Sequence, residues 1–190
     1  KVCVSGAKRL KDFISYHKIK INNCGKIIIP QNKNLDSQLD LLYERGKANG
    51  AQVEFWDEQQ LNKKVPEAIT ASGRALWSPQ TSVINPIEIL KKLKEELVKL
   101  GVSFYLNEKN WTFNNKKREI SLKKSNTISY NWLVNSSGLN ADKIAHSFNV
   151  GLNYKLIPFK GLYWEIKKTS KLKIETNIYP VPDLNVPFLG

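Results

Sequence analysis

Methionine is absent from the 190-residue sequence, which begins with Lys1. The sequence also ends directly after the apolar pair Phe188-Leu189 and a single glycine, with no further residues to cover that pair. A chain without an initiator and with an uncovered apolar end is typical of a piece of a longer protein. We therefore expect this chain to be an internal fragment.

Cysteine is scarce as well. Only Cys3 and Cys24 occur, and they form neither a Cys-x-x-Cys pair nor another metal-ligand spacing. The two histidines, His17 and His146, fall in expected helices and have no carboxylate at a useful spacing. The sequence therefore predicts reduced thiols, no metal site and a cytoplasmic location. It has no run of about 18 apolar residues, so no transmembrane segment is predicted.

Arginine contributes little to the formal net charge of +13. Lysine carries almost all of that charge, and the lysines are spread along the chain rather than gathered in one stripe. Proteins that read bases and phosphates favour the planar guanidinium of arginine, and this chain has only four arginines. The composition favours a solvated surface with no specific nucleic-acid partner. A lysine-rich nucleic-acid binder is the weaker alternative.

Sequence motifs of several enzyme classes are missing. No Gly-x-Gly-x-x-Gly, no phosphate-binding P-loop and no Gly-x-Ser-x-Gly elbow occurs. Without Gly-x-Gly-x-x-Gly, the chain lacks the loop that usually binds the pyrophosphate of a dinucleotide. The other two absences leave kinase and serine-hydrolase functions without support.

What the sequence does contain is 41% hydrophobic residues, enough for the core of one domain or two small ones. Their spacing predicts helices over 6–17, 35–50, 57–61, 85–100 and 140–148. It predicts strands over 26–29, 53–56, 102–106, 110–113, 119–122, 128–134, 154–159, 161–166 and 174–179. Helices between strands, with a strand meander inserted, indicate an α/β (α+β) fold.

The expected helix after Asn85 has the clearest start. Asn85 can cap it, Pro86 suits the first helical position, and Glu88 can reach back to the backbone N–H of the cap. We expect five apolar positions of this helix to face the core: Ile87, Leu90, Leu93, Leu97 and Leu100.

Two further segments carry the functional indications. The segment Trp132–Val134 is predicted to be an apolar strand that leads into the small-residue turn Asn135–Gly138 and then into a helix. In an α/β sheet that geometry brings backbone N–H groups toward an anionic ligand. The terminal segment Ile178–Gly190 has three prolines between its two aromatic residues. Because proline fixes φ and lacks a donor, this segment is expected to be a rigid loop.

Several motifs resemble one family of flavoenzymes in order and spacing. They are Gly25–Ile29, Glu44–Gly50, Ala75–Thr81, Pro158–Gly161 with Tyr163, Tyr179–Asp183 and Pro187–Gly190. On these residues the chain resembles the FAD-dependent oxidoreductases of the D-amino-acid oxidase superfamily, closest to the L-2-hydroxyglutarate oxidase/dehydrogenase group. It departs from the family at Ser82–Asn85, at Ser136-Ser137 and at Lys160, where the family has arginine. Loss of a bidentate arginine leaves the substrate open.

The resemblance implies two interleaved parts. Residues 1–24 and 80–150 would belong to an FAD-binding domain, and residues 25–79 and 151–190 to a substrate-binding domain with a mixed, largely antiparallel sheet and helices. FAD is the implied cofactor. Without the Gly-x-Gly-x-x-Gly loop, this chain alone is expected to hold FAD weakly.

The resemblance also implies the cofactor-binding residues. Asn135, Ser136, Ser137 and Gly138 would bring backbone close to the phosphates or ribose of FAD. Trp111 would offer its backbone N–H and C=O on the adenine side. An ordinary strand-to-helix turn, and core packing of the indole, are the alternatives.

Lys160, Tyr163 and Tyr179 are the implied substrate-binding residues. A lysine would attract a dicarboxylate, and an aromatic ring would pack against the face of the flavin. The alternative is that residues of a strand simply alternate between core and solvent. Asp183 is expected to be a turn residue rather than a general base, so the catalytic residue stays unknown.

The predicted function is therefore that of a fragment of an FAD-dependent oxidoreductase acting on a small 2-hydroxy acid. L-2-hydroxyglutarate is the first choice, oxidised to 2-oxoglutarate by hydride transfer to the flavin. The fragment itself is expected to be inactive. The alternative is a non-catalytic remnant or interaction module that keeps the fold but not the cofactor. Oligomerisation is left open, and a location peripheral to a membrane would go with a dehydrogenase.

Overall fold

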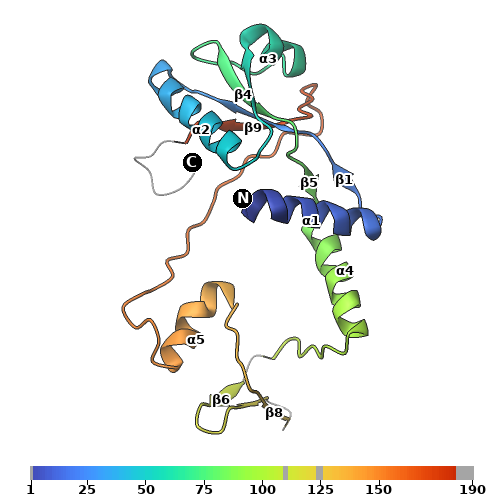
Figure 1. Ribbon diagram of the computed structural model, residues 1–190, viewed down its shortest axis with the longest axis vertical. Coiled ribbons are helices and arrows are strands. Elements are labelled where there is room, and N and C mark those ends of the chain that lie inside the picture. The colour runs from blue at the N-terminus through green and yellow to red at the C-terminus, as the bar shows by residue number, and fades with distance from the viewer. Residues whose placement is uncertain (1, 109–110, 123–125, 183–190) are drawn as a thin grey trace. The chain divides into compact units, whose positions relative to one another are not determined.

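The computed structural model describes residues 2–108, 111–122 and 126–182. The chain divides into two compact units (Figure 1). Unit 1 comprises Lys1–Gly101 and Lys171–Gly190, and unit 2 comprises Val102–Ser170.

A mixed four-stranded sheet is the centre of unit 1. Its strands, in spatial order, are β3 (Glu54–Asp57), β4 (Arg74–Ser78), β2 (Lys26–Ile29) and β9 (Asn177–Pro180). β4 pairs antiparallel with both β3 and β2, whereas β9 joins β2 in parallel with Ile28 opposite Tyr179. The pairing brings two segments together that lie about 150 residues apart in the sequence.

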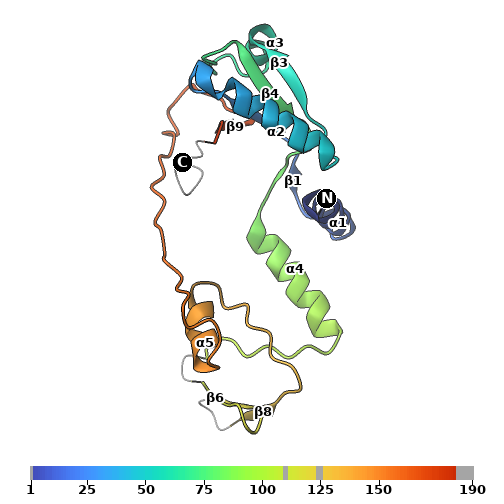
Figure 2. The same ribbon diagram turned by 60° about the vertical axis from the view of Figure 1, so that its left-hand side comes forward.

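Helices cover the two faces of this sheet (Figure 2). On one face, Leu39 of α2 (Asp36–Ala48, entered through the 3-10 turn η1, Lys33–Leu35) packs against Leu76 and Val181. On the other face, Leu61 of α3 (Glu58–Lys64) packs in a separate cluster. The members of that second cluster are Ile27, Ile29, Leu61, Val65, Ala68 and Ala75. Alternate residues of β2 and β4 serve opposite faces, as the two-residue period of a strand requires.

A smaller apolar cluster joins the remaining elements of unit 1. Ile14 of α1 (Val2–Tyr16) and Ile89 of α4 (Pro86–Lys99) are buried together with Ile19. The two-residue strands β1 (Ile21–Asn22) and β5 (Val83–Ile84) pair antiparallel beside them.

The prediction of which face of α4 is buried is wrong. Only Ile89 of this helix is buried, and the five apolar residues expected in the core are exposed: Ile87, Leu90, Leu93, Leu97 and Leu100. The predicted cap is confirmed, because Asn85 Oδ1 accepts from the N–H of Ile87. Glu88, however, accepts from the side-chain amide of Asn85 rather than from its backbone. A full capping box occurs instead at α3, between Asp57 and Gln60.

Gly25 permits a close approach that no other residue would. Its φ is +70°, and a Cβ on it would lie 1.9 Å from the ring of Trp77. That ring stacks on Trp56 at 4.6 Å between centroids, which closes the edge of the cluster around Leu61. A glycine is therefore required where the chain enters β2.

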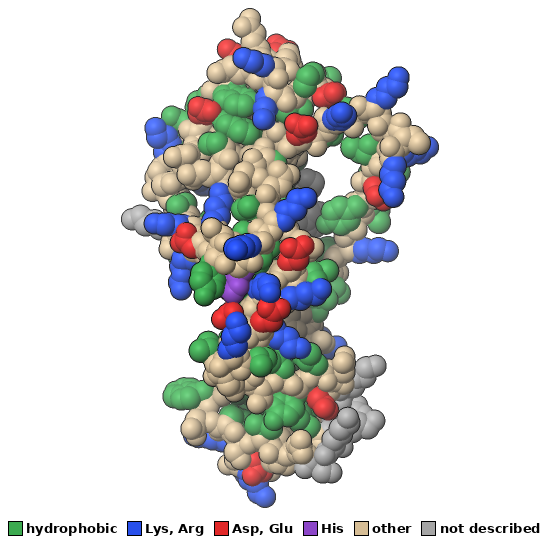
Figure 3. Space-filling model, turned by 90° about the vertical axis from the view of Figure 1, so that its right-hand side faces the viewer, with side chains coloured by type: hydrophobic (Ala, Val, Ile, Leu, Met, Phe, Trp, Pro, Cys, Tyr) green, Lys and Arg blue, Asp and Glu red, His purple; other side chains and the backbone are tan. Residues whose placement is uncertain are grey.

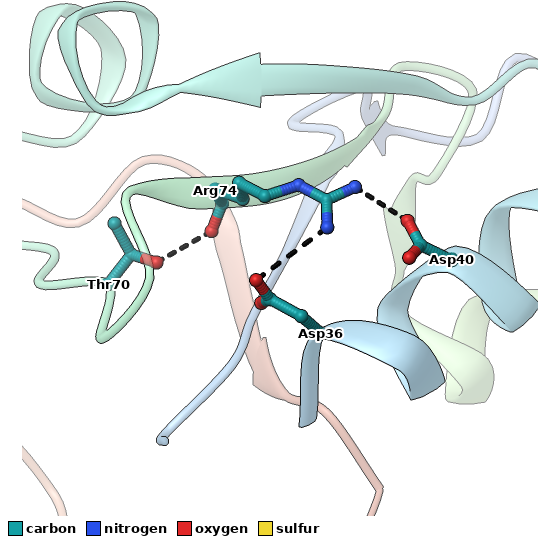
Figure 4. Close-up of polar contacts among 4 residues, drawn as sticks. All are labelled: Asp36, Asp40, Thr70 and Arg74. Atoms are coloured by element: carbon teal, nitrogen blue, oxygen red, sulfur yellow. Dashed lines mark hydrogen bonds and ion pairs between the residues drawn. The ribbon is translucent and has the colours of Figure 1, made fainter. Parts of the chain in front are cut away.

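Arg74 ties the central sheet to α2 (Figure 4). Its guanidinium lies 2.6 Å from Asp40 Oδ1 and 3.7 Å from Asp36 Oδ2, and it stacks 4.6 Å above the ring of Phe55. The hydrogen bond to Asp40 is the main cause that raises the pKa of Arg74. The backbone carbonyl of Arg74 accepts from the hydroxyl of Thr70 at 2.6 Å. This contact set is structural, because the side-chain partners of Arg74 belong to the helix and the sheet that it joins.

Unit 2 contains a three-stranded antiparallel meander and one short helix. The strands are β6 (Thr112–Asn114), β7 (Glu119–Ser121) and β8 (Thr127–Ser129), and a 3-10 turn η2 (Gly138–Asn140) leads into α5 (Ala141–Ser147). No described residue of unit 2 is buried.

Three strands predicted for unit 2 are wrong, and the strand predicted over 128–134 ends at Ser129, so that Trp132–Val134 is not a strand. Residues 102–106, 154–159 and 161–166 have no regular secondary structure. Their alternating apolar residues suit a strand, but a strand forms only where a neighbour accepts its backbone hydrogen bonds. None of the sheets formed by the described residues includes these segments. The predicted fold class is confirmed: helices combine with sheets that are mixed and largely antiparallel.

Candidate functional site

The turn Asn135–Gly138 is built around one side chain. Asn135 Oδ1 accepts from the backbone N–H and the hydroxyl of Ser137, at 3.3 and 2.8 Å. Its Nδ2 donates to the carbonyl oxygen of Ala141, at 2.8 Å. Asn135 therefore uses its whole amide to shape the turn, which leaves the backbone of Ser136 and Gly138 as the surface that a ligand would meet.

Gly138 gives this turn an open approach. Its φ is +54°, a backbone conformation that glycine adopts without strain. A Cβ placed on it would meet no atom within 4 Å. A ligand could thus lie directly against the backbone at this position.

Helix α5 fastens the loop that follows it. Asp142 Oδ2 accepts from the N–H of Leu156 at 3.1 Å, and Oδ1 accepts from the N–H of Lys143 at 2.8 Å. These two bonds, the one from Leu156 first, hold the pKa of Asp142 below its ordinary value. His146 Nε2 lies 3.0 and 2.9 Å from the carbonyl oxygens of Gly151 and Tyr154. Since both partners are acceptors, Nε2 must carry the proton.

Trp111 lies at the start of the meander and is half-buried. Its ring is 5.6 Å from that of Phe113, which in turn stacks on Phe148 at 4.5 Å. The indole thus begins a row of three rings that links β6 to the residue after α5. Packing explains this side chain, and its backbone role toward a cofactor stays a prediction.

Lys160 and Tyr163 lie in an extended, exposed segment of unit 2. Tyr163 is 94% exposed, and its ring folds back over Gly161, where a Cβ would lie 2.9 Å from Tyr163 Cε2. Tyr179 belongs to unit 1, on β9, with Lys26 Nζ 5.6 Å from the centre of its ring. The three predicted substrate residues are thus divided between the two units, and Asp183 lies outside the described residues.

A cavity that the sequence did not predict lies within unit 1. Its volume is about 640 Å³, and one face of α1 forms a wall of it. That face carries residues spaced by three and four: Cys3, Val4, Ala7, Leu10, Lys11 and Ile14. Across the cavity are the turn at Gly50–Gln52 and the segment from Ser78 to Ile84, and Lys11 Nζ donates to the carbonyl oxygen of Gln80 at 2.8 Å. The spacing along α1 was the signal that could have revealed it.

Charge of one sign does not gather at a site on the face of the molecule shown in Figure 3. Lysine and arginine side chains are scattered among acidic ones on that face. In the described parts of the chain, no group of three or more His, Cys, Asp or Glu side chains could hold a metal ion. No helix among those residues is long and apolar enough to cross a membrane.

Two solved structures have a similar fold. The L-proline dehydrogenase from P. horikoshii has a TM-score of 0.66 at 15% identity, covering 76% of this chain and 40% of that one. The L-α-glycerophosphate oxidase from Mycoplasma pneumoniae with FAD bound has a TM-score of 0.64 at 17% identity, covering 93% of this chain and 48% of that one. At these identities the likeness shows the fold, which is that of the α/β flavin-dependent oxidoreductases.

The family follows from the sequence. Residues 1–190 match the family described as FAD dependent oxidoreductase (DAO), and the chain therefore belongs to that family. The L-2-hydroxyglutarate dehydrogenase of Indibacter alkaliphilus is 32% identical over 195 residues, covering 100% of this chain and 48% of that protein. The mitochondrial L-2-hydroxyglutarate dehydrogenase of Caenorhabditis briggsae is 30% identical over 203 residues, covering 100% and 45%. The chain spans about half the length of the relatives that it matches.

Proposed function

We propose that this chain is part of an FAD-dependent oxidoreductase that oxidises a small 2-hydroxy acid, with L-2-hydroxyglutarate as the first substrate to test. The observation that carries the proposal is the family match over the whole chain, supported by relatives named L-2-hydroxyglutarate dehydrogenase. FAD, when bound, would supply the acceptor for the hydride that leaves the α-carbon of the substrate.

The turn Asn135–Gly138 fits the role of approaching FAD. Gly138 leaves space above its backbone, and Asn135 fixes the turn without using the backbone groups of Ser136 or Gly138. These residues, with the backbone of Trp111, would bind and orient the cofactor rather than react.

Lys160, Tyr163 and Tyr179 would act on the substrate. The ammonium of Lys160 is exposed and would attract a carboxylate of the 2-hydroxy acid. The rings of Tyr163 and Tyr179 are also exposed and would exclude water from the reacting carbon. The division into an FAD-binding part (1–24 and 80–150) and a substrate-binding part (25–79 and 151–190) belongs to the same proposal, as does a cytoplasmic location.

The first experiment is a visible absorption spectrum of the 190-residue chain after incubation with excess FAD and desalting. Retained flavin bands would support a cofactor site built by this chain, and a folded but colourless protein would contradict it. Gly138→Val should reduce retention, because its side chain fills the open approach. Gly73→Val is the matched control, since Gly73 also has a positive φ, +77°, and no atom within 4 Å of its Cβ position, but lies in unit 1, outside the turn.

If flavin is retained, bleaching by L-2-hydroxyglutarate under anaerobic conditions tests the substrate. Lys160→Met should raise the substrate concentration needed for bleaching by about tenfold, and Lys160→Arg should preserve it, because arginine retains the charge and adds a bidentate donor. Equal bleaching by L-lactate would contradict a dicarboxylate substrate.

The second candidate is an interaction module that keeps the fold without the cofactor. The exposed apolar residues of α4 favour it, because apolar side chains on one face of a helix bind partners. A folded chain that never retains FAD, yet self-associates or captures a partner through α4, would favour this candidate over the enzyme.

A further inference from the structure

Helix α5 is too short to be stable by itself. It has seven residues, Ala141–Ser147, whereas isolated helices shorter than about 12–15 residues are marginal in water. None of its residues is buried, so core packing contributes little to it. Its presence must therefore depend on the bonds that hold its two ends.

The first end is held by the turn predicted to approach FAD. The bond from Asn135 Nδ2 to the carbonyl oxygen of Ala141 joins the turn to the first residue of the helix. The same side chain accepts both donors of Ser137. The turn cannot keep this shape unless Ala141 stays where the helix places it.

The loop that leads toward Lys160 is held from both ends of the helix, by Asp142 in its first turn and His146 in its last. Asp142 accepts the N–H of Leu156, and His146 donates between the carbonyl oxygens of Gly151 and Tyr154. Asp142 and His146 are four residues apart, so they lie on the same side of the helix. The loop is thus fixed at both of its ends by one helical face.

We propose that α5 couples the turn Asn135–Gly138 to the loop 151–156, so that ordering one of them orders the other. Because α5 persists only while both ends are held, loosening either end raises the population in which the whole helix is open. Asp142 and His146 are then positioning residues for the segment that carries Lys160. The functional meaning of this coupling rests on the proposed function: FAD at the turn would order the substrate segment, and by linkage substrate would favour FAD.

The test is backbone amide exchange, measured by NMR on the 190-residue chain at constant pH. Asn135→Ala should speed the exchange of the Leu156 amide by about threefold or more, although Asn135 does not touch that loop. Asp142→Ala should likewise speed the exchange of the Ser137 amide. Lys143→Ala, an exposed neighbour on the same helix, should change neither amide.

Two further readouts keep the result decisive. Asp142→Asn retains one carbonyl oxygen, so it should give the same effect at a smaller size. The Ile120 amide, in β7 of the same unit, should keep its exchange rate in every variant. Variants that each perturb only their own end would overturn the coupling, and so would an equal rise at Ile120, which would signal global unfolding.

Addition of FAD to the wild-type chain separates this inference from the proposed function. Slower exchange at Ser137 and Leu156 together would support both. Slower exchange at Ser137 alone would overturn the coupling. If the variants show the coupling but FAD slows neither amide, the coupling stands and the FAD-binding role of the turn fails.

Discussion

Unit 1 and unit 2 keep their structures by different means. Every buried residue among those described belongs to unit 1, where three apolar clusters hold four helices to two sheets. Unit 2 has no buried residue in its described part, and side-chain hydrogen bonds to backbone groups shape its turns. The difference matters because all the predicted site residues except Tyr179 lie in unit 2. The candidate site thus stands on the less densely packed unit, where a single hydrogen bond decides local geometry.

The largest effect on the free energy of unfolding is expected from a substitution at the centre of unit 1. Leu39→Ala removes a side chain that is fully buried between α2 and the sheet, so it should lower the free energy of unfolding by about 3 kcal/mol. Urea unfolding followed by the fluorescence of the stacked pair Trp56 and Trp77 measures this. Two control variants should each change the free energy of unfolding by less than about 1 kcal/mol. They are Leu41→Ala, on the exposed side of the same helix, and Leu139→Ala, in unit 2. A loss at Leu139 as large as that at Leu39 would break the comparison.

A somewhat smaller loss of stability is expected from a substitution at Gly25, where the chain enters β2. Gly25→Ala forces a Cβ into the ring of Trp77 at a position with positive φ, and should cost about 2–3 kcal/mol. Gly50→Ala is the matched control, because Gly50 has a φ of +81° and open space around its Cβ position. That variant should lose only about 1 kcal/mol, the cost of the backbone conformation alone. The measurement is the same urea titration, and equal losses in both variants would show that the contact with Trp77 is unimportant.

A modest effect is expected at the tie between the sheet and α2. Arg74→Met removes the ion pairs with Asp40 and Asp36, but the guanidinium is about a third exposed and water screens it. The loss should therefore be about 1 kcal/mol, and it should shrink as salt is raised. Thermal unfolding at low and high ionic strength measures it. Arg45→Met, an exposed arginine of α2, should have no comparable salt-dependent effect.

The smallest effect on stability is expected from Asp142 in unit 2. Its pKa is depressed in the folded state by the N–H groups of Leu156 and Lys143. Its contribution is therefore fully present above the unfolded value and is lost as the pH falls through the folded pKa. The amide shift of Leu156, followed by NMR during acid titration, should report a midpoint below the ordinary aspartate value of about 3.9. Asp142→Asn should abolish that titration. A midpoint at or above the ordinary value would contradict the hydrogen bond to Leu156.

The sequence predicted unit 1 better than unit 2. The run Lys26–Ile29, the cap at Asn85 and the periodicity of α2 all led to elements that the structure confirms. β2 and α2 pack against a core, and burial enforces the periodicity of their residues. In unit 2 the same reasoning placed strands at 102–106 and 154–166 that do not form. Their apolar residues suit a sheet, but the pairing partners that a strand requires are not a property of the segment itself.

The candidate site was predicted as a set of residues and not as a geometry. The small residues of 135–138 marked the turn, but the role of Asn135 as its internal hydrogen-bonding partner was missed. Asp142 and His146 were missed as well, because their partners are backbone groups 5 to 14 residues away, which leave no signature in side-chain spacing. Asx side chains that precede a turn were the available signal.

By itself the sequence determined the family, the mixed α/β class and the positions of the packed helices and of strands β2, β3 and β9 in unit 1, because these depend on motifs and on local periodicity. It did not predict β4 (Arg74–Ser78), which pairs with both β2 and β3. Only the tertiary structure decided that β9 joins β2 in parallel across about 150 residues, that α4 leaves its leucines exposed, and that α5 holds a turn and a loop together. The physical reason is the same in all three cases. Backbone pairing and burial depend on which distant segment arrives as the partner, and no local pattern of residues carries that information.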